Sequence, residues 1–281
     1  MENIIITDQN KFDSIIQKFK ETGLSNLHIV SDFDKTLSKF SFGERKIHSI
    51  IGVLREESYL TPDYSDRAKA LFEKYHPIEI NLDLSLEERK KAMYEWWKTH
   101  FELLIECGLS KNDLEKIVNS NIVGLRDKNQ EFFDFLTKYN IPLTIISASG
   151  LGGDIINMIF NQYGYWNENI NVIANNFNFD DNGKVIGIKE PIIHSLNKYD
   201  VIIEDPLIFD KIKDRKNIIL LGDGIDDIGM VSNLKYDNIL KIGYLNEKVE
   251  ENMENYKKVY DVLILNDGSL EFVNNLLQPL I

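Results

Sequence analysis

Hydrophobic and polar positions follow two periods along this chain, and the two alternate. Short, continuous apolar runs rich in isoleucine, leucine and valine are typical of buried parallel strands. Such runs occupy residues 28–31, 141–146, 217–221, 239–242 and 262–265. Apolar residues spaced three or four positions apart predict amphipathic helices. These cover residues 12–20, 131–138, 155–163, 247–256 and 269–277. The alternation predicts an α/β core with a mainly parallel sheet.

Residues 42–121 break this alternation. Strand patterns almost vanish there, and charged, helix-forming residues dominate. Ser85 and Glu88 have the spacing of a capping box, which predicts a helix that runs to Glu106. We therefore predict a helical cap domain at 42–121, inserted between the first two core strands, with 1–41 and 122–281 as the α/β core.

A hairpin is predicted in the second half of the chain. The sequence Asp-Asp-Asn-Gly at 180–183 is a strong turn signal, and it separates two candidate strands at 172–179 and 184–188.

Carboxylates gather at the ends of two predicted strands. Asp32 and Asp34 follow the first strand, and Asp223, Asp226 and Asp227 follow the strand at 217–221. Ligands of open α/β sheets bind outside the carboxyl ends of the strands, so these acids should surround one site. One carboxylate could attack a phosphorus atom while another manages the leaving-group proton, and Mg²⁺ would relieve their repulsion. Loop and helix-cap roles are the ordinary alternative for each acid.

A third strand end carries hydroxyls and glycines. The strand at 141–146 runs into Ser147-Ala148-Ser149-Gly150-Leu151-Gly152-Gly153-Asp154, and a helix follows. Hydroxyls, backbone N–H groups and a helix N-terminus together can bind phosphate. A plain strand-to-helix turn is equally compatible with this segment.

Composition limits the partners. The chain has 281 residues, of which 43% are hydrophobic, and this is enough for a large core. A formal net charge of −13 disfavours nucleic-acid polymers and anionic membranes, whereas a small phosphorylated substrate stays compatible. Cys107 is the single cysteine and lies in an apolar stretch, which indicates a buried thiol. No signal peptide or membrane-spanning run is visible, so we expect a cytoplasmic protein.

The order of these motifs resembles that of a known superfamily. Asp32-Phe33-Asp34-x-Thr36, Ser147 after a strand, Lys198 downstream and Gly222-Asp223-Gly224-x-Asp226-Asp227 resemble the haloacid-dehalogenase (HAD) aspartate-nucleophile phosphatases. Within that superfamily, the chain is similar from about residue 27 onward to the cytosolic pyrimidine 5′-nucleotidase (cytosolic 5′-nucleotidase III) family. The blocks that carry this closer similarity are 32–40, 74–80, 95–97, 189–194, 197–198, 217–223 and 241–246.

The resemblance implies a doubly wound, mainly parallel Rossmann-like core with an inserted α-helical cap. It also implies Mg²⁺-dependent catalysis in which Asp32 becomes an aspartyl-phosphate, while Asp34 protonates the leaving nucleoside and then activates water. The implied metal-binding residues are Asp32, Asp34, Asp223 and Asp227. The implied phosphoryl-binding residues are Ser147, Ala148, Ser149 and Lys198, with Lys198 also catalytic.

The resemblance places the nucleoside pocket in the cap. Glu79 matches the family's glutamate that reads the base or the sugar, and Trp97 and His100 fall where aromatic and polar groups face the base. Adjacent helical residues point about 100° apart, so only one of Trp96 and Trp97 should belong to the cap core. Stacking of Trp97 on a base and packing of Trp97 within the cap are equally compatible with the sequence.

Three positions depart from the family's pattern. The second motif is longer than usual, so Ser147 and Ser149 both qualify as the phosphate-binding serine, and Ser147 is favoured because it ends the strand. Asp226 stands where many superfamily members have asparagine. Lys35 brings an extra cation beside the nucleophile, and its side chain could simply point to solvent.

These expectations combine into one functional prediction. The protein should hydrolyse nucleoside 5′-monophosphates to nucleoside and phosphate as a monomer, with CMP and UMP as the implied substrates. 7-Methyl-GMP stays open as a substrate because a cationic base stacks well on indole. The alternatives are a HAD phosphatase for another small metabolite, such as phosphoserine, and a non-catalytic ligand-binding protein on the same fold.

Overall fold

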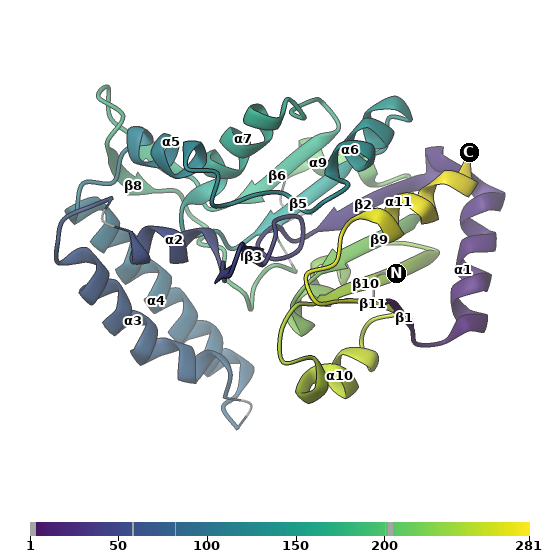
Figure 1. Ribbon diagram of the computed structural model, residues 1–281, viewed down its shortest axis with the longest axis horizontal. Coiled ribbons are helices and arrows are strands. Elements are labelled where there is room, and N and C mark those ends of the chain that lie inside the picture. Colours follow the sequence, from purple (N-terminus) through teal and green to yellow (C-terminus); the bar gives the residue numbers. More distant parts are fainter. Residues whose placement is uncertain (1–3, 58, 82, 200, 202–204) are drawn as a thin grey trace.

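A central sheet with helices on both faces organises the computed structural model, which describes residues 4–57, 59–81, 83–199, 201 and 205–281 (Figure 1). Within those ranges the sheet has seven strands in the order β1-β11-β10-β9-β2-β5-β6. The strands are β1 (Ile4–Ile6), β2 (Leu27–Ser31), β5 (Leu143–Ser147), β6 (Ile170–Ala174), β9 (Asn217–Gly222), β10 (Asn238–Leu245) and β11 (Val262–Leu265). All neighbours pair in parallel except β1, which is antiparallel to β11.

Both faces of the sheet are covered because successive strand residues point to opposite sides. Ile29 and Ile219 pack in one cluster with the helices of the first face. These helices are α1 (Gln9–Thr22), α6 (Asn129–Lys138), α7 (Gly152–Tyr163) and α11 (Glu271–Leu277). Val30 and Leu220 face the other side, which is covered by α9 (Pro206–Ile212), the 3₁₀ helix η2 (Ile225–Val231) and α10 (Val249–Lys257). The predicted doubly wound, mainly parallel fold is confirmed.

The segment between β2 and β5 is mostly helical, as predicted. It contains the short hairpin β3 (Ser41–Phe42) and β4 (Arg45–Lys46), followed by α2 (Ile50–Glu56), α3 (Tyr64–Glu79), α4 (Leu86–Glu106) and α5 (Lys111–Asn119). Helices α3 and α4 pack side by side and project from the sheet at the lower left of Figure 1. Helix α5 packs on α7 of the core. The division of the chain into a core and a cap at residues 42 and 121 stays a prediction.

Local signals placed both ends of α4 correctly. Ser85 and Glu88 form both halves of a capping box at the start of α4, which ends at Glu106 as predicted. Gly23 ends α1 with a positive φ of 72°, a conformation that glycine adopts without steric cost. Cys107, directly after α4, is buried as expected.

The predicted strand at 172–179 is wrong as a single element. Its first half is β6, which pairs with β5 in the large sheet, and only β7 (Phe177–Phe179) pairs with β8 (Val185–Ile188) in the hairpin. The chain leaves the sheet at Asn175, whose buried side chain donates to the carbonyls of Ser149 and Ile193. These bonds hold the chain at a break that strand periodicity does not reveal. Helix α7 also begins at Gly152 rather than at residue 155, and β1 and α9 were not predicted.

Helices long and apolar enough to cross a membrane are absent from the described part of the chain.

Candidate active site

The carboxyl ends of β9, β2 and β5 lie side by side and bring three loops together. A cavity of about 570 Å³ opens at this edge between the sheet and the helices α2, α3 and α4. Its lining includes the predicted residues Asp32, Asp34, Glu79, Trp97, His100, Ser147, Ala148, Lys198 and Asp223. The sequence prediction that separate strand ends surround one site is therefore supported by the geometry.

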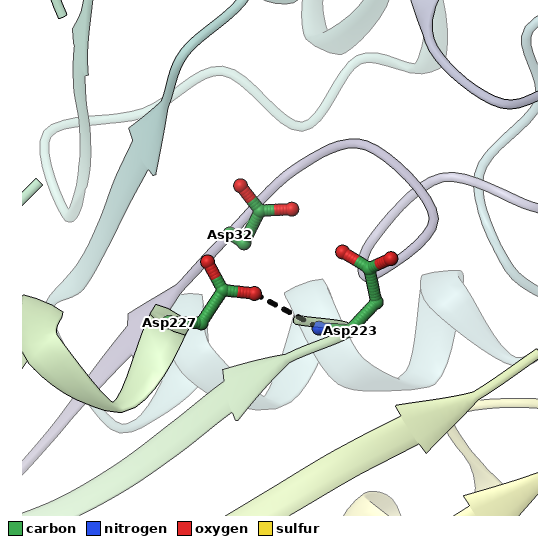
Figure 2. Close-up of side chains that lie close together, drawn as sticks. All are labelled: Asp32, Asp223 and Asp227. Atoms are coloured by element: carbon green, nitrogen blue, oxygen red, sulfur yellow. Dashed lines mark hydrogen bonds between the residues drawn. The ribbon is translucent and has the colours of Figure 1, made fainter. Parts of the chain in front are cut away.

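Three carboxylates form the floor of the site (Figure 2). Asp32 follows β2, Asp223 follows β9, and Asp227 lies in η2; one oxygen from each lies within 4.8 Å of the others. Asp227 Oδ2 accepts the backbone N–H groups of Asp223 at 3.1 Å and Gly224 at 2.9 Å. These two bonds fix the turn after β9, so that its acids face Asp32.

A glycine is required at the end of β9. A Cβ atom on Gly222 would lie 2.6 Å from Asp227 Cβ and 2.7 Å from the Tyr260 hydroxyl. Both distances are shorter than van der Waals contact. The absence of a side chain at Gly222 therefore lets Asp227 fold back against the strand.

Lys198 joins two of the carboxylates. Its Nζ lies 2.5 Å from Asp32 Oδ1 and 2.9 Å from Asp227 Oδ1, and all three side chains are buried. Burial raises the pKa of Asp32 to about 8, and the charges of Asp227 and Asp223 add to this rise while Lys198 opposes it. Lys198 alone does not balance the three carboxylates, so a further cation beside them would lower the pKa of Asp32 and favour its ionised form.

Asp34 lies beside the three-carboxylate cluster rather than in it. Its Oδ1 accepts the backbone N–H of Ile50 at 3.0 Å, at the start of α2. Burial raises the pKa of Asp34 to about 6, although the bond from Ile50 opposes the shift. A carboxyl group that titrates near neutral pH is suited to general acid and base work.

Lys35 points into the site and not to solvent, so of the two alternatives that the sequence left open, the structure shows the extra cation. Its Nζ lies 2.6 Å from Asp223 Oδ2. The backbone of Lys35 has a positive φ of 58°, which turns the chain sharply between Asp34 and Thr36. Lys35 is therefore a second cation at the acidic floor. Asp226 is outside the three-carboxylate cluster.

The two candidate serines differ in position. Ser147, Ala148 and Gly150 line the cavity. Ser149 is buried, and its Oγ accepts the backbone N–H of Leu151 at 3.2 Å, within the turn itself. Ser147 Oγ accepts the N–H of Ser149 at 3.1 Å, which leaves its own hydrogen available to a ligand.

The cap side of the cavity presents one carboxylate and a row of rings. Glu79 accepts a hydrogen bond of 2.6 Å from the Ser195 hydroxyl, and its other oxygen lies 3.0 Å from His76 Nδ1. Burial favours the neutral carboxyl, but these two partners prevail and keep the pKa of Glu79 below its usual value. The Trp97 ring stacks against the rings of Trp96 and Phe101, whose centroids lie 5.9 and 5.6 Å from its own.

Trp96 and Trp97 both line the cavity but differ in burial. Trp96 is 7% exposed and belongs to a cap cluster formed by Tyr75, Met93, Trp96 and Leu196. Trp97 is only partly buried and faces the cavity. His100 is buried beside it and bonds the Tyr64 hydroxyl at 3.0 Å.

Several cavity residues were missed at the sequence level, among them Ser195 and Arg55. Ser195 orients Glu79, and Arg55 lines the cavity from the last turn of α2. Neither belongs to a motif, and a serine in a loop or an arginine on a short helix carries no local signal. Leu196 and Lys198 come from the same loop as Ser195, so one segment contacts the cap cluster and the nucleophile candidate.

Comparison with known proteins decides the family. A family model described as pyrimidine 5′-nucleotidase (UMPH-1) matches residues 35–281. The chain belongs to this family. The nucleotidase is also 38% identical to a chicken (Gallus gallus) 7-methylguanosine phosphate-specific 5′-nucleotidase, over 94% of this chain and 91% of that protein. A Caenorhabditis elegans relative, a putative cytosolic 5′-nucleotidase 3, is 32% identical over 96% of this chain and 73% of its own length.

Solved structures agree with the fold of the nucleotidase. The crystal structure of cytosolic 5′-nucleotidase IIIB bound to cytidine superimposes with a TM-score of 0.88 and 27% identity, covering 100% of this chain and 94% of that chain. A phosphoserine phosphatase with a phospho-aspartyl intermediate analogue has a TM-score of 0.54 at 16% identity, covering 89% of this chain and 97% of that chain, and shows the shared HAD fold. The predicted family, HAD fold and activity are confirmed: the protein is an enzyme, a 5′-nucleotidase that hydrolyses nucleoside 5′-monophosphates.

Proposed function

We propose that the cavity at the ends of β2, β5 and β9 carries out this hydrolysis in two steps. Asp32 attacks the phosphorus atom, and the bond from phosphorus to O5′ breaks as Asp34 gives its proton to the leaving oxygen. Water then attacks the aspartyl-phosphate, Asp34 takes its proton, and phosphate leaves Asp32. The observation that carries this assignment is the buried Asp32, held at 2.5 Å by Lys198 at the floor of the cavity.

The residues present fit a magnesium ion. Asp32, Asp223 and Asp227 offer carboxylate oxygens within 4.8 Å of one another, and hard oxygen ligands suit Mg²⁺. We assign Mg²⁺ to these three side chains and to the backbone carbonyl of Asp34, which leaves the Asp34 carboxyl free for proton transfer. When bound, Mg²⁺ neutralises phosphoryl charge and orients the phosphoryl group.

Lys198 and Ser147 hold the other phosphoryl oxygens in this assignment. Lys198 already lies on the nucleophile, so its ammonium offsets the negative charge that develops as Asp32 attacks. Ser147 presents its hydroxyl, and Ala148 its backbone, at the end of β5. In this assignment the Ser149 hydroxyl stabilises the turn and does not bind the phosphoryl group.

The cap wall receives the nucleoside. Glu79 accepts hydrogen bonds from N–H or O–H groups of the base or sugar, and Trp97 supplies an aromatic face worth about 1–3 kcal/mol in base stacking. The buried His100 supports Trp97, since their rings stack with centroids 5.9 Å apart. The name of the family model points to pyrimidines, the chicken relative is named for 7-methylguanosine phosphate, and the solved neighbour holds cytidine. We therefore propose CMP, UMP and 7-methyl-GMP as the substrates to compare, for a cytoplasmic, monomeric enzyme.

Phosphate release from a panel of monophosphates tests the proposal. The panel is CMP, UMP, AMP, GMP, 7-methyl-GMP and phosphoserine, each with Mg²⁺ and with EDTA. We expect Mg²⁺-dependent turnover confined to nucleotides, and phosphorylated protein after acid quenching of the wild type. Asp32→Asn should remain folded and lose both turnover and the phosphorylated intermediate. An Asp32→Asn protein that still turns over CMP would refute the assigned nucleophile.

A further inference from the structure

Arg55 places a positive charge in the nucleoside half of the cavity. It lies in the last turn of α2 and lines the cavity together with Phe72, Trp97 and His100. Its guanidinium carbon lies 5.2 Å from the centre of the Phe72 ring, so its side chain packs on the aromatic wall. The residue is only partly exposed.

No acid among the described residues forms an ion pair with this guanidinium. The two carboxylates next in the chain, Glu56 and Glu57, both pair with Arg45, at 2.8 and 2.7 Å. Burial lowers the pKa of Arg55, but a guanidinium remains charged at neutral pH. The charge of Arg55 acts on the residues of the pocket. Burial is the larger cause, and Arg55 the second, of a fall in the pKa of His100 to about 3. The buried imidazole is therefore neutral and adds no second cation.

Arg55 and Glu79 give the cavity complementary polar groups. The guanidinium offers only donors, and the carboxylate offers only acceptors. A neutral base with both carbonyl oxygens and N–H groups along its edge satisfies the two together. 7-Methylguanine does not satisfy both groups. An arginine can donate to the N7 and O6 acceptors of guanine together, but methylation removes the N7 acceptor and gives the ring a positive charge.

We propose that Arg55 is a specificity-determining residue that selects neutral, carbonyl-bearing bases against a cationic base such as 7-methylguanine. The inference rests on the proposed function, since it concerns the same pocket. Trp97 alone would attract a cationic base, and Arg55 opposes that attraction by repulsion across a partly desolvated site. This chain is thus expected to depart from the substrate named for its 7-methylguanosine phosphate-specific relatives.

The test compares GMP with 7-methyl-GMP, which differ in the methyl group and its charge. The ratio of kcat/KM for 7-methyl-GMP to that for GMP should rise about tenfold in Arg55→Met, equivalent to about 1.4 kcal/mol. Arg55→Lys keeps the charge and should retain most of the discrimination. Arg67→Met is the matched control, because Arg67 pairs with Glu106 at 2.6 Å, outside the cavity lining, and its ratio should equal the wild type's.

Direct binding separates this inference from the catalytic proposal. Calorimetric titration of guanosine and 7-methylguanosine, in mildly acidic buffer with Mg²⁺, needs no turnover and should show the same shift in ratio. A wild type that binds these nucleosides with the expected ratio but hydrolyses nothing would refute the catalytic assignment alone. A ratio unchanged in Arg55→Met, or an Arg55→Lys protein that behaves like Arg55→Met, would overturn the role of Arg55. Parallel weakening of both ligands would indicate a purely structural effect and would overturn it too.

Discussion

The position of the Trp97 ring depends on Gly150, a glycine in the turn between β5 and α7. A Cβ atom at Gly150 would lie 2.6 Å from Trp97 Cζ3, 2.9 Å from Cη2 and 3.1 Å from Ile51 Cβ. The ring cannot yield freely, because Trp96, His100 and Phe101 stack around it at 5.6–5.9 Å. Gly150→Ala should therefore push the indole out of place by roughly 1 Å, at about 1–3 kcal/mol of overpacking.

The expected functional result is selective. If the indole stacks on the base, its displacement should raise KM for nucleotides about tenfold, within the 1–3 kcal/mol that stacking provides. Gly153→Ala is the matched control, because its new Cβ would lie 3.5 Å or more from every neighbour, which is ordinary contact. Steady-state kinetics and thermal unfolding of both variants supply the measurement. An unchanged KM in Gly150→Ala, with a normal melting temperature, would show that Trp97 neither touches this turn nor binds the base.

Two further predictions concern the metal and the pH. Lys35→Met should tighten Mg²⁺ binding about tenfold, because the Lys35 ammonium at 2.6 Å competes for Asp223. Mg²⁺ titration of the melting temperature measures this change. Lys39→Met is the control and should leave Mg²⁺ binding unchanged, because Lys39 pairs with Asp127 and does not line the cavity. Burial lowers the pKa of His28 and of His100 to about 3, so the unfolded chain binds protons at these residues below about pH 6.5 while the folded protein does not. The histidine contribution to the free energy of unfolding is therefore lost as the pH drops from about 6.5 toward 3, while the raised pKa values of Asp32 and Asp34 oppose that loss. His28→Asn removes one of these histidines, so its urea midpoint should fall less than that of the wild type over this range, and equal falls in the two proteins would contradict the reasoning.

Sequence reasoning located the acidic floor because strand ends and carboxylates are local features. The run before Asp32 and the run before Asp223 each read as buried strands, and parallel strands place their carboxyl ends together. Asp227 was also found, since it lies only four residues beyond Asp223. The assignment of Ser147 over Ser149 remained open because both hydroxyls follow the same strand.

The rest of the site depends on contacts between distant segments. The sequence left the orientation of Lys35 open, and a positive φ and a partner nearly two hundred residues away turn its side chain inward. Arg55 has no ion-pair partner next to it in the chain because Arg45 pairs with Glu56 and Glu57. Such pairing between separate segments cannot be predicted from one sequence. The break between β6 and β7 was missed for the same reason, since Asn175 is held by carbonyls of two other loops.

The loop that carries Ser195, Leu196 and Lys198 makes base recognition and chemistry mechanically dependent on each other. Any motion that carries α3 and α4 away from the sheet must draw Leu196 from the cap cluster or pull on Lys198, two residues further along. Contacts between the substrate and Glu79, which accepts a hydrogen bond from Ser195, then also affect the position of the Lys198 ammonium that donates to Asp32. A substrate that lacks its base would therefore lose turnover rate and not affinity alone, because the enzyme uses remote contacts to align its nucleophile.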